Sequence, residues 1–256
     1  MKKTLTILLI TIFSLAVLGL AVGSYLQHRQ GVVRQVIVRL HAADEQAFIT
    51  VDQVNQLIHS KDSIIGSPLK TILVHHIERQ IASNPYVKSA DIYLNITGNL
   101  MVDVYEREAL LRVYNNINQS FYVDTDGNLF PISDKYSARV IPVNGYLKIP
   151  FREGKNVSDS LFRLTMLPGI YQLAQQIKER PFLEAAISQL FVNSRGEVDL
   201  IPEMGPHLIH FGNITDVGIK LDNLAAFYKQ ALVKEGWNKY KSINLAYTNQ
   251  VICTKY

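Results

Sequence analysis

The sequence predicts an α+β chain in which an N-terminal transmembrane helix precedes two folded regions. Three observations support this fold class. A long run without charge opens the chain. A strand, two helices and two more strands then follow within residues 32–108, and β-rich segments with flanking helices fill residues 109–256. The helices and strands are distinguished by the spacing of their apolar residues.

The predicted transmembrane helix spans residues 4–26 and follows a short tail at residues 1–3. No Asp, Glu, Lys or Arg occurs between Lys3 and Arg29. A helix rises about 1.5 Å per residue, so roughly 20 apolar residues cross a hydrocarbon core of about 30 Å. Lys2 and Lys3 place the tail in the cytoplasm, so we expect the rest of the chain on the extracytoplasmic side of the cytoplasmic (inner) membrane.

A cleaved signal peptide is the alternative interpretation of this run. Two lysines, an apolar stretch and the small residues Ala21-Val22-Gly23 also resemble a signal with its cleavage site. The apolar stretch is longer than the roughly 7–15 residues usual in a signal peptide, and it continues beyond Gly23. We therefore favour a retained anchor in contact with membrane lipid.

The region 32–108 predicts a three-stranded sheet with two helices on one face. Residues 32–40 are rich in β-branched side chains and form the first strand. Thr50 and Gln53 have the spacing of a capping box, which marks the start of the first helix. Ser67-Pro68 indicates the start of the second helix.

The second helix is expected to bury one apolar face and to end near a proline. Its expected inward residues are Leu69, Ile72, Leu73, Ile77 and Ile81. Asn84-Pro85 ends the helix, because proline disfavours helical geometry in the preceding residue. Residues 87–94 and 100–108 then read as two strands joined by a hairpin turn.

The region 109–256 predicts a second, β-rich domain. Asp126-Gly127 forms a turn between two strands, and a helical face precedes Pro181. Further expected elements are a strand at 141–145, a loop at 149–160, a hairpin at 190–201, a strand at 208–212, a helix from Thr215, and final strands at 242–247 and 250–255.

Composition and charge limit the possible class of protein. The 256 residues are 48% hydrophobic and 19% charged, which is typical of folded domains. The net charge is +4, and no cluster of Lys and Arg with interleaved aromatics occurs, so nucleic-acid binding is not indicated. The single cysteine, Cys253, leaves no internal disulfide.

No convergent catalytic or metal-binding set is visible. His207 and His210 have metal-like spacing, but a strand directs them to opposite faces. Asp124 opens a segment resembling a calcium loop, yet the bidentate glutamate expected at its twelfth position is Lys135. We expect no cofactor, no metal, no small-molecule substrate and no enzymatic activity.

Three segments together resemble a POTRA domain of the FtsQ/DivIB family of cell-division proteins. They are Phe48-Ile49-Thr50-Val51-Asp52-Gln53-Val54, Asn84-Pro85-Tyr86-Val87-Lys88-Ser89-Ala90 and Val102-Asp103-Val104-Tyr105-Glu106-Arg107-Glu108. The segments Phe121–Phe130 and Ile141–Gly145 continue the resemblance into the second domain.

The resemblance implies a non-enzymatic scaffold at the bacterial division septum. Such proteins bind the single-pass proteins FtsB (DivIC) and FtsL and help control septal peptidoglycan synthesis. Two alternatives are another POTRA-type envelope assembly factor and a membrane-anchored envelope enzyme. The first would need a long β-barrel after the POTRA domain, and the second a convergent catalytic set.

The expected partner-binding site lies in the last two strands. A chain-terminal strand can lie at a sheet edge, where a partner strand adds to unpaired backbone groups. The resemblance implies the same place, because FtsQ proteins receive FtsB on a Leu-x-Tyr strand and the edge strand after it. The expected site residues are Leu245, Tyr247, Gln250, Val251, Ile252, Cys253, Thr254 and Lys255. Alternation further predicts that Ile243, Leu245 and Tyr247 share one face.

We predict that the anchor is retained in the mature protein. The uncharged run behind Lys2 and Lys3 is long enough to span the membrane. Mass spectrometry of the membrane-extracted protein should therefore give the mass of the full chain. Loss of roughly the first 23 residues would instead identify a cleaved signal.

Overall fold

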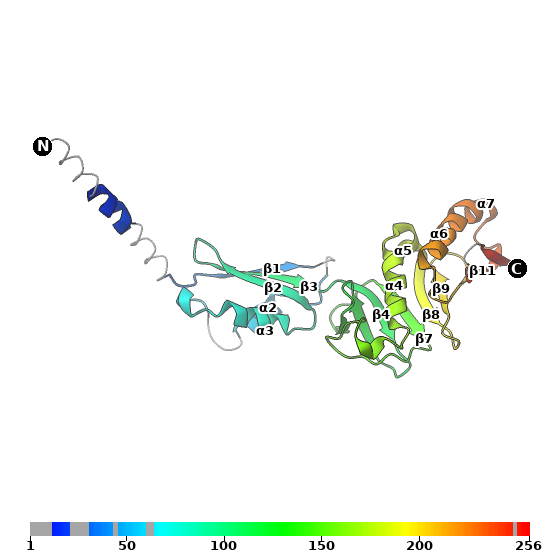
Figure 1. Ribbon diagram of the computed structural model, residues 1–256, viewed down its shortest axis with the longest axis horizontal. Coiled ribbons are helices and arrows are strands. Elements are labelled where there is room, and N and C mark those ends of the chain that lie inside the picture. Colours follow the sequence, from blue (N-terminus) through cyan, green and yellow to red (C-terminus); the bar gives the residue numbers. More distant parts are fainter. Residues whose placement is uncertain (1–11, 21–30, 43–45, 60–63, 248–249) are drawn as a thin grey trace. The chain divides into compact units, whose positions relative to one another are not determined.

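The fold is that of a computed structural model, which describes residues 12–20, 31–42, 46–59, 64–247 and 250–256 (Figure 1). The chain divides into two compact units. The first comprises residues 1–42 and 49–106, and the second comprises residues 43–48 and 107–256.

The predicted transmembrane segment lies mostly outside the described residues. Residues 12–20 are helical with exposed side chains, whereas Lys2, Lys3 and Tyr25 are not among the described residues. Within the described part of the chain, every helix is too short or too polar to cross a membrane. The transmembrane helix therefore stays a prediction.

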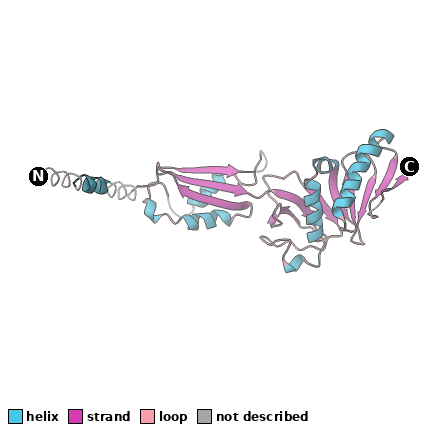
Figure 2. Cartoon of the chain, turned by 45° about the horizontal axis from the view of Figure 1, so that its top comes forward, coloured by secondary structure: helices cyan, strands magenta, loops and turns pink. Residues whose placement is uncertain are grey.

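The first unit is a three-stranded sheet with its helices on one face (Figure 2). The strand order is β1-β3-β2, with β1 parallel and β2 antiparallel to the central β3. This arrangement confirms the predicted α+β sheet and its two helices. The elements are β1 (Val36–His41), α2 (Val51–His59), the 3₁₀ turn η1 (Leu69–Thr71), α3 (Val74–Ala82), β2 (Val87–Leu94) and β3 (Leu100–Glu106).

The capping box at the start of α2 is confirmed. The backbone N–H of Gln53 donates to Thr50 Oγ1 at 3.3 Å, and the backbone N–H of Thr50 donates to Gln53 Oε1 at 2.9 Å. These reciprocal bonds satisfy two backbone donors at the helix start. Helix α2 then buries Val54 and Ile58, whereas Val51 is exposed.

The second helix begins later than the Ser67-Pro68 signal predicts. That signal opens only η1, and the chain is extended at Ile72 before α3 begins at Val74. The reason is pairing with the N-terminal segment, because Val33 donates to the Ser67 carbonyl and accepts from Gly66. Because α3 begins only at Val74, the placement of Leu73 on a buried helix face was wrong. Its side chain is 72% exposed.

The second unit is built on one nine-stranded sheet. Among the described residues, its strand order is β12-β11-β10-β9-β8-β7-β4-β5-β6. The strands are β4 (Ala109–Tyr114), β5 (Ser120–Asp124), β6 (Leu129–Pro131), β7 (Ile141–Gly145), β8 (Ile187–Val192), β9 (Val198–Pro202), β10 (Leu208–Gly212), β11 (Tyr240–Asn244) and β12 (Ile252–Lys255). The β-rich character predicted for the second domain is thereby confirmed.

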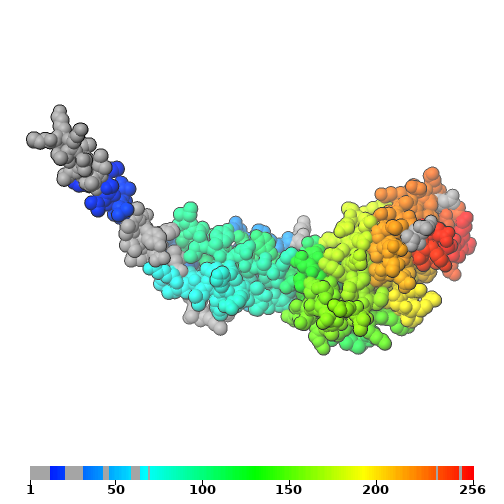
Figure 3. All heavy atoms as spheres, in the orientation of Figure 1, coloured from blue at the N-terminus to red at the C-terminus, as the bar shows by residue number. Residues whose placement is uncertain are grey.

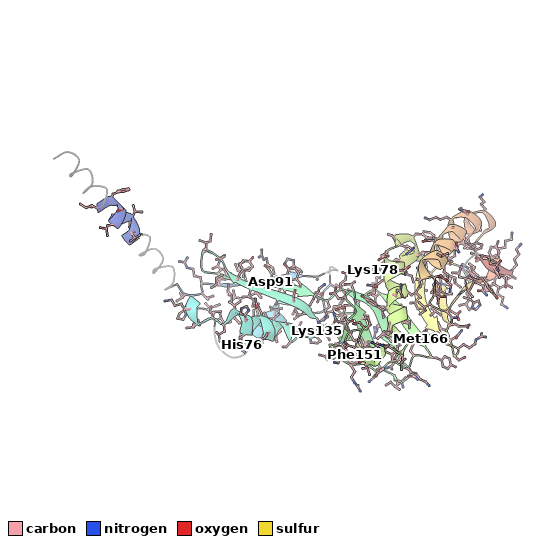
Figure 4. All side chains as sticks on the ribbon, viewed as in Figure 1. His76, Asp91, Lys135, Phe151, Met166 and Lys178 are labelled. Carbon is pink, nitrogen blue, oxygen red and sulfur yellow. The ribbon has the colours of Figure 1, made fainter. Side chains whose placement is uncertain are left out.

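The helices of this unit share the core with one face of the sheet (Figures 1 and 2). They are the 3₁₀ turn η2 (Ser160–Phe162), α4 (Leu167–Lys178), α5 (Pro181–Ala186), α6 (Val217–Phe227), the π-helical turn η3 (Tyr228–Leu232) and α7 (Val233–Glu235). Lys178, at the end of α4 (Figure 4), forms an ion pair with Glu108. The predicted helical face before Pro181 is confirmed, and a second helix, α5, follows directly from Pro181.

A single row of apolar side chains crosses the sheet. Paired residues on neighbouring strands point to the same face. The recorded pairs connect Phe121, Val113, Val143, Leu190, Leu200, Ile209, Ile243 and Cys253. All but Cys253 are fully buried in the core, and Cys253 packs against that core from the edge.

We predict that Ile81→Ala destabilises the first unit far more than Leu73→Ala. Ile81 is 0% exposed, so truncation leaves a cavity that costs about 2–5 kcal/mol. Leu73 is mostly exposed, and its truncation should change the free energy of unfolding by less than about 0.5 kcal/mol. Urea denaturation of both variants measures these costs. Equal losses in the free energy of unfolding would contradict the assignment of Ile81 as buried and Leu73 as exposed.

Candidate docking edge

The last strand lies at one end of the large sheet (Figure 1). β12 pairs antiparallel with β11, and β11 pairs parallel with β10. No described residue outside β11 has a recorded backbone hydrogen bond to Ile252–Lys255. Figure 3 shows these C-terminal residues, in red, on the surface beside the orange residues of α6 and α7. Among the residues that the structure describes, none therefore pairs with this side of β12.

The opposite end of the same sheet is closed. Its edge strand, β6, contains Pro131 and is only three residues long. Leu129 donates to the Lys155 carbonyl at 2.7 Å and accepts from Gly154 at 3.0 Å, so a loop occupies the outer side of β6. Of the two ends, β12 is the one that presents unoccupied backbone groups within the described chain.

The eight predicted site residues divide into an inward and an outward group. The inward group holds the edge onto the core and consists of Leu245, Val251 and Cys253. The outward group is exposed and consists of Tyr247, Gln250, Ile252, Thr254 and Lys255. The structure therefore brings all eight to one end of the sheet, although only the outward group is exposed.

Ile243 and Leu245 are buried in the same core, as predicted, but the placement of Tyr247 on their face was wrong. β11 begins earlier than predicted, at Tyr240, and ends at Asn244, whose Oδ1 accepts from the Ala246 N–H at 2.8 Å. This side-chain bond competes with the strand and turns the chain. Leu245 stays buried, whereas Tyr247 is 55% exposed.

The turn after β11 rests against the C-terminal half of β10. The Leu245 N–H donates to the His210 carbonyl at 2.8 Å. Gly212 has φ of +75°, and a Cβ there would lie 3.1 Å from the Cβ of Ala246. Glycine at this position thus permits the close approach of β10 and the turn after β11.

A buried lysine also holds the C-terminal end of β10. Lys220 on α6 donates from Nζ to the carbonyls of Phe211 at 3.2 Å and Asn213 at 2.8 Å. Burial lowers the pKa of this ammonium group, and Asp216 partly opposes that effect. Sequence periodicity did not identify Lys220 because lysine is seldom fully buried.

The two histidines have separate partners. His207 is buried, and its Nε2 lies 2.7 Å from the Tyr228 hydroxyl. The Nδ1 of His210 lies 2.8 Å from Asp199 Oδ1 on the neighbouring strand β9. Within the described chain, no group of three or more His, Cys, Asp or Glu residues could hold a metal ion.

The predicted turn at Asp124 is confirmed. The buried Asp124 carboxylate accepts the backbone N–H groups of Asp126 at 3.0 Å and Asn128 at 2.7 Å. Arg107 also donates to it, at 2.7 Å. The Asp124 carboxylate therefore stabilises the turn through these hydrogen bonds.

Comparison with protein families now identifies the class of protein. A POTRA-like domain matches residues 31–105, which make up most of the first unit. The family described as FtsQ/DivIB, C-terminal related, matches residues 108–254, which include nearly all of the large sheet. No curated protein matches the chain closely.

The chain therefore belongs to the FtsQ/DivIB family, as the sequence resemblance predicted. It is a cell-division-associated protein with a POTRA-like domain. Members of this family act in complexes with other division proteins at the membrane of the division site.

We predict that Cys253 reacts slowly with alkylating reagents in the folded protein. Burial raises the pKa of its thiol, and the thiolate is the reactive form. Because Cys253 is the single cysteine, the label acquired by the whole chain reports on β12 alone. Alkylation followed by mass spectrometry, with and without denaturant, measures the protection.

Two substitutions sharpen this measurement. Leu245→Ala removes a buried side chain from the cluster against which Cys253 packs, so alkylation should become faster. Tyr247→Ala alters an exposed side chain and should leave the rate unchanged. Equal rates for the native and denatured protein would contradict the packing of β12 on the core.

Proposed function

We propose that this protein is a membrane-anchored, non-enzymatic scaffold of the bacterial divisome, located at the septum. It binds FtsB/DivIC-like and FtsL-like single-pass proteins and, through them, helps control septal peptidoglycan synthesis. Its membership of the FtsQ/DivIB family supports this assignment. The single observation that carries the binding step is the open outer side of β12.

The proposed domain layout follows from the predicted topology. Residues 1–3 are cytoplasmic, residues 4–26 form the anchor, residues 32–108 form the POTRA domain and residues 109–256 form the C-terminal β domain. Both folded domains lie on the extracytoplasmic side of the membrane. The two compact units support a division of the chain close to residues 106–109.

The proposed binding mode is addition of a partner strand alongside β12. Backbone hydrogen bonds in such a ladder supply affinity, and side chains on its two faces supply specificity. On one face, the partner continues the apolar row that ends at Cys253. On the other face, it lies beside Ile252, which is 43% exposed, and Thr254. An amphipathic segment with alternating side chains fits both environments.

We predict that Tyr247→Ala weakens partner binding by about 2 kcal/mol or more, roughly 30-fold in Kd. An exposed tyrosine beside an open edge has the character of an interface anchor. Deletion of residues 250–256 should abolish binding because it removes β12. Affinity measurements between the detergent-solubilised full chain and purified FtsB/DivIC-like and FtsL-like proteins test both changes.

Tyr146→Ala is the matched control. Tyr146 is also an exposed tyrosine of the second unit, but it follows β7 in the middle of the sheet order. Its replacement should leave binding unchanged. Circular dichroism should show that all variants stay folded. A chain lacking residues 250–256 that still captures its partners with full affinity would exclude β12 as the docking site.

A further inference from the structure

His207 joins three segments that surround the base of the docking edge. It lies directly before β10, and its Nε2 is 2.7 Å from the hydroxyl of Tyr228. Tyr228 begins the π-helical turn η3. The ring of Tyr228 also packs edge-on against Trp237, with centroids 5.4 Å apart, shortly before β11 begins. One histidine thus links the approaches to β10 and β11 through a single tyrosine.

The surroundings of His207 favour a neutral ring. Its side chain is 1% exposed, and the Tyr228 ring lies edge-on at 5.6 Å. Within the described residues, Nδ1 has no hydrogen-bond partner of acceptable geometry. Burial lowers the pKa of His207, and the nearby backbone of Trp237 only partly opposes this effect. A buried charge without a paired counterion is costly.

The Nδ1 side of His207 lies close to Gly205 and to the Trp237 carbonyl. Gly205 has φ of +88°, and a Cβ there would lie 2.9 Å from His207 Nδ1 and 3.2 Å from the Trp237 carbonyl oxygen. His207 Nδ1 and the Trp237 carbonyl oxygen therefore both lie close to Gly205. An imidazolium carries N–H groups on both ring nitrogens, so the Tyr228 hydroxyl could no longer donate to Nε2.

No described carboxylate forms an ion pair with His207. Tyr228 is the titratable side chain bonded to it, and burial raises the pKa of that phenol. On the same turn, Lys229 lies over the Phe182 ring, at 5.3 Å from its centroid. Glu203, before Gly205, and Lys234, on α7, have exposed side chains. On β10, His210 is engaged with Asp199.

We propose that His207 is a pH-sensitive latch whose protonation loosens the contacts between β10, η3 and the Trp237 segment and thereby releases the docking edge. The neutral ring closes the latch, and acidification opens it. The first part of this inference concerns the fold alone. The effect on partner binding rests on the proposed function of β12.

The sign of the pH dependence follows from linkage. The unfolded or locally opened state binds a proton with a pKa near about 6.5, whereas the closed state binds it more weakly. Stability of the closed state is therefore fully present above about pH 6.5 and declines as the pH falls below that value. Uptake of one proton raises the opening equilibrium by up to about tenfold per pH unit.

Hydrogen exchange of the detergent-solubilised full chain between about pH 7.5 and 5.5 tests the latch. After correction for intrinsic exchange rates, amides of β10 and β11 should open increasingly as the pH falls. His207→Gln, which cannot titrate, should remove this pH dependence. His210→Gln, on the adjoining strand β10, is the matched control and should retain the pH dependence. Exchange that is independent of pH, or identical in His207→Gln and the unsubstituted chain, would overturn the latch.

Two further measurements cover failure of a variant to fold. The NMR signal of the His207 ring in the unsubstituted chain should titrate over the same pH range as the opening of β11, and an unrelated range would overturn the proposal. Tyr228→Phe retains the ring and His207, so hydrogen exchange of this variant should remain pH-dependent.

Partner affinity measured over the same pH range separates the effect of His207 on the fold from its effect on docking. If exchange responds but affinity does not, the latch is supported and its link to docking is overturned.

Discussion

The second unit depends on one apolar row that runs across its sheet from β5 to β12. Phe121, Val113 and Val143 begin the row, and Ile209, Ile243 and Cys253 end it. Each pair brings apolar side chains together on the helix-covered face, where burial contributes about 25 cal/mol per Å² of apolar surface. A slip of one residue would turn such a strand's apolar set toward the other face. The row therefore fixes the register of the sheet, and with it the place where β12 ends the sheet.

Much of this register could be predicted from sequence because the signals are local. The β-branched runs, the turn at Asp124 and the capping box of Thr50 and Gln53 each depend on residues close together in the chain. The misplacement of Leu73 has a different origin. The helix signal at Ser67-Pro68 is overridden by pairing with Val33, more than 30 residues earlier, and no local pattern records that contact.

The candidate site was predictable in position but not in detail. A strand at the end of the chain suggested an edge, and β12 lies at the end of the sheet. Which side chains face outward depends on the turn at Asn244, whose side chain caps the Ala246 N–H and leaves Tyr247 exposed. The contact between His207 and Tyr228 was also hidden, because Tyr228 is 21 residues away and lies on a π-helical turn.

In the proposed docking mode, β12 must accept one partner and avoid indiscriminate pairing, and it has features suited to both. The strand is only four residues long, and it ends at the exposed Lys255. Short strands and lysine at an edge disfavour uncontrolled association between sheets. A partner gains little from so short a ladder alone and therefore needs contacts beyond it. The exposed Tyr247 and Ile252 can supply such contacts, whereas Leu245, Val251 and Cys253 hold the edge in place. In this mode, the exposed side chains, rather than the backbone, would determine which partner binds.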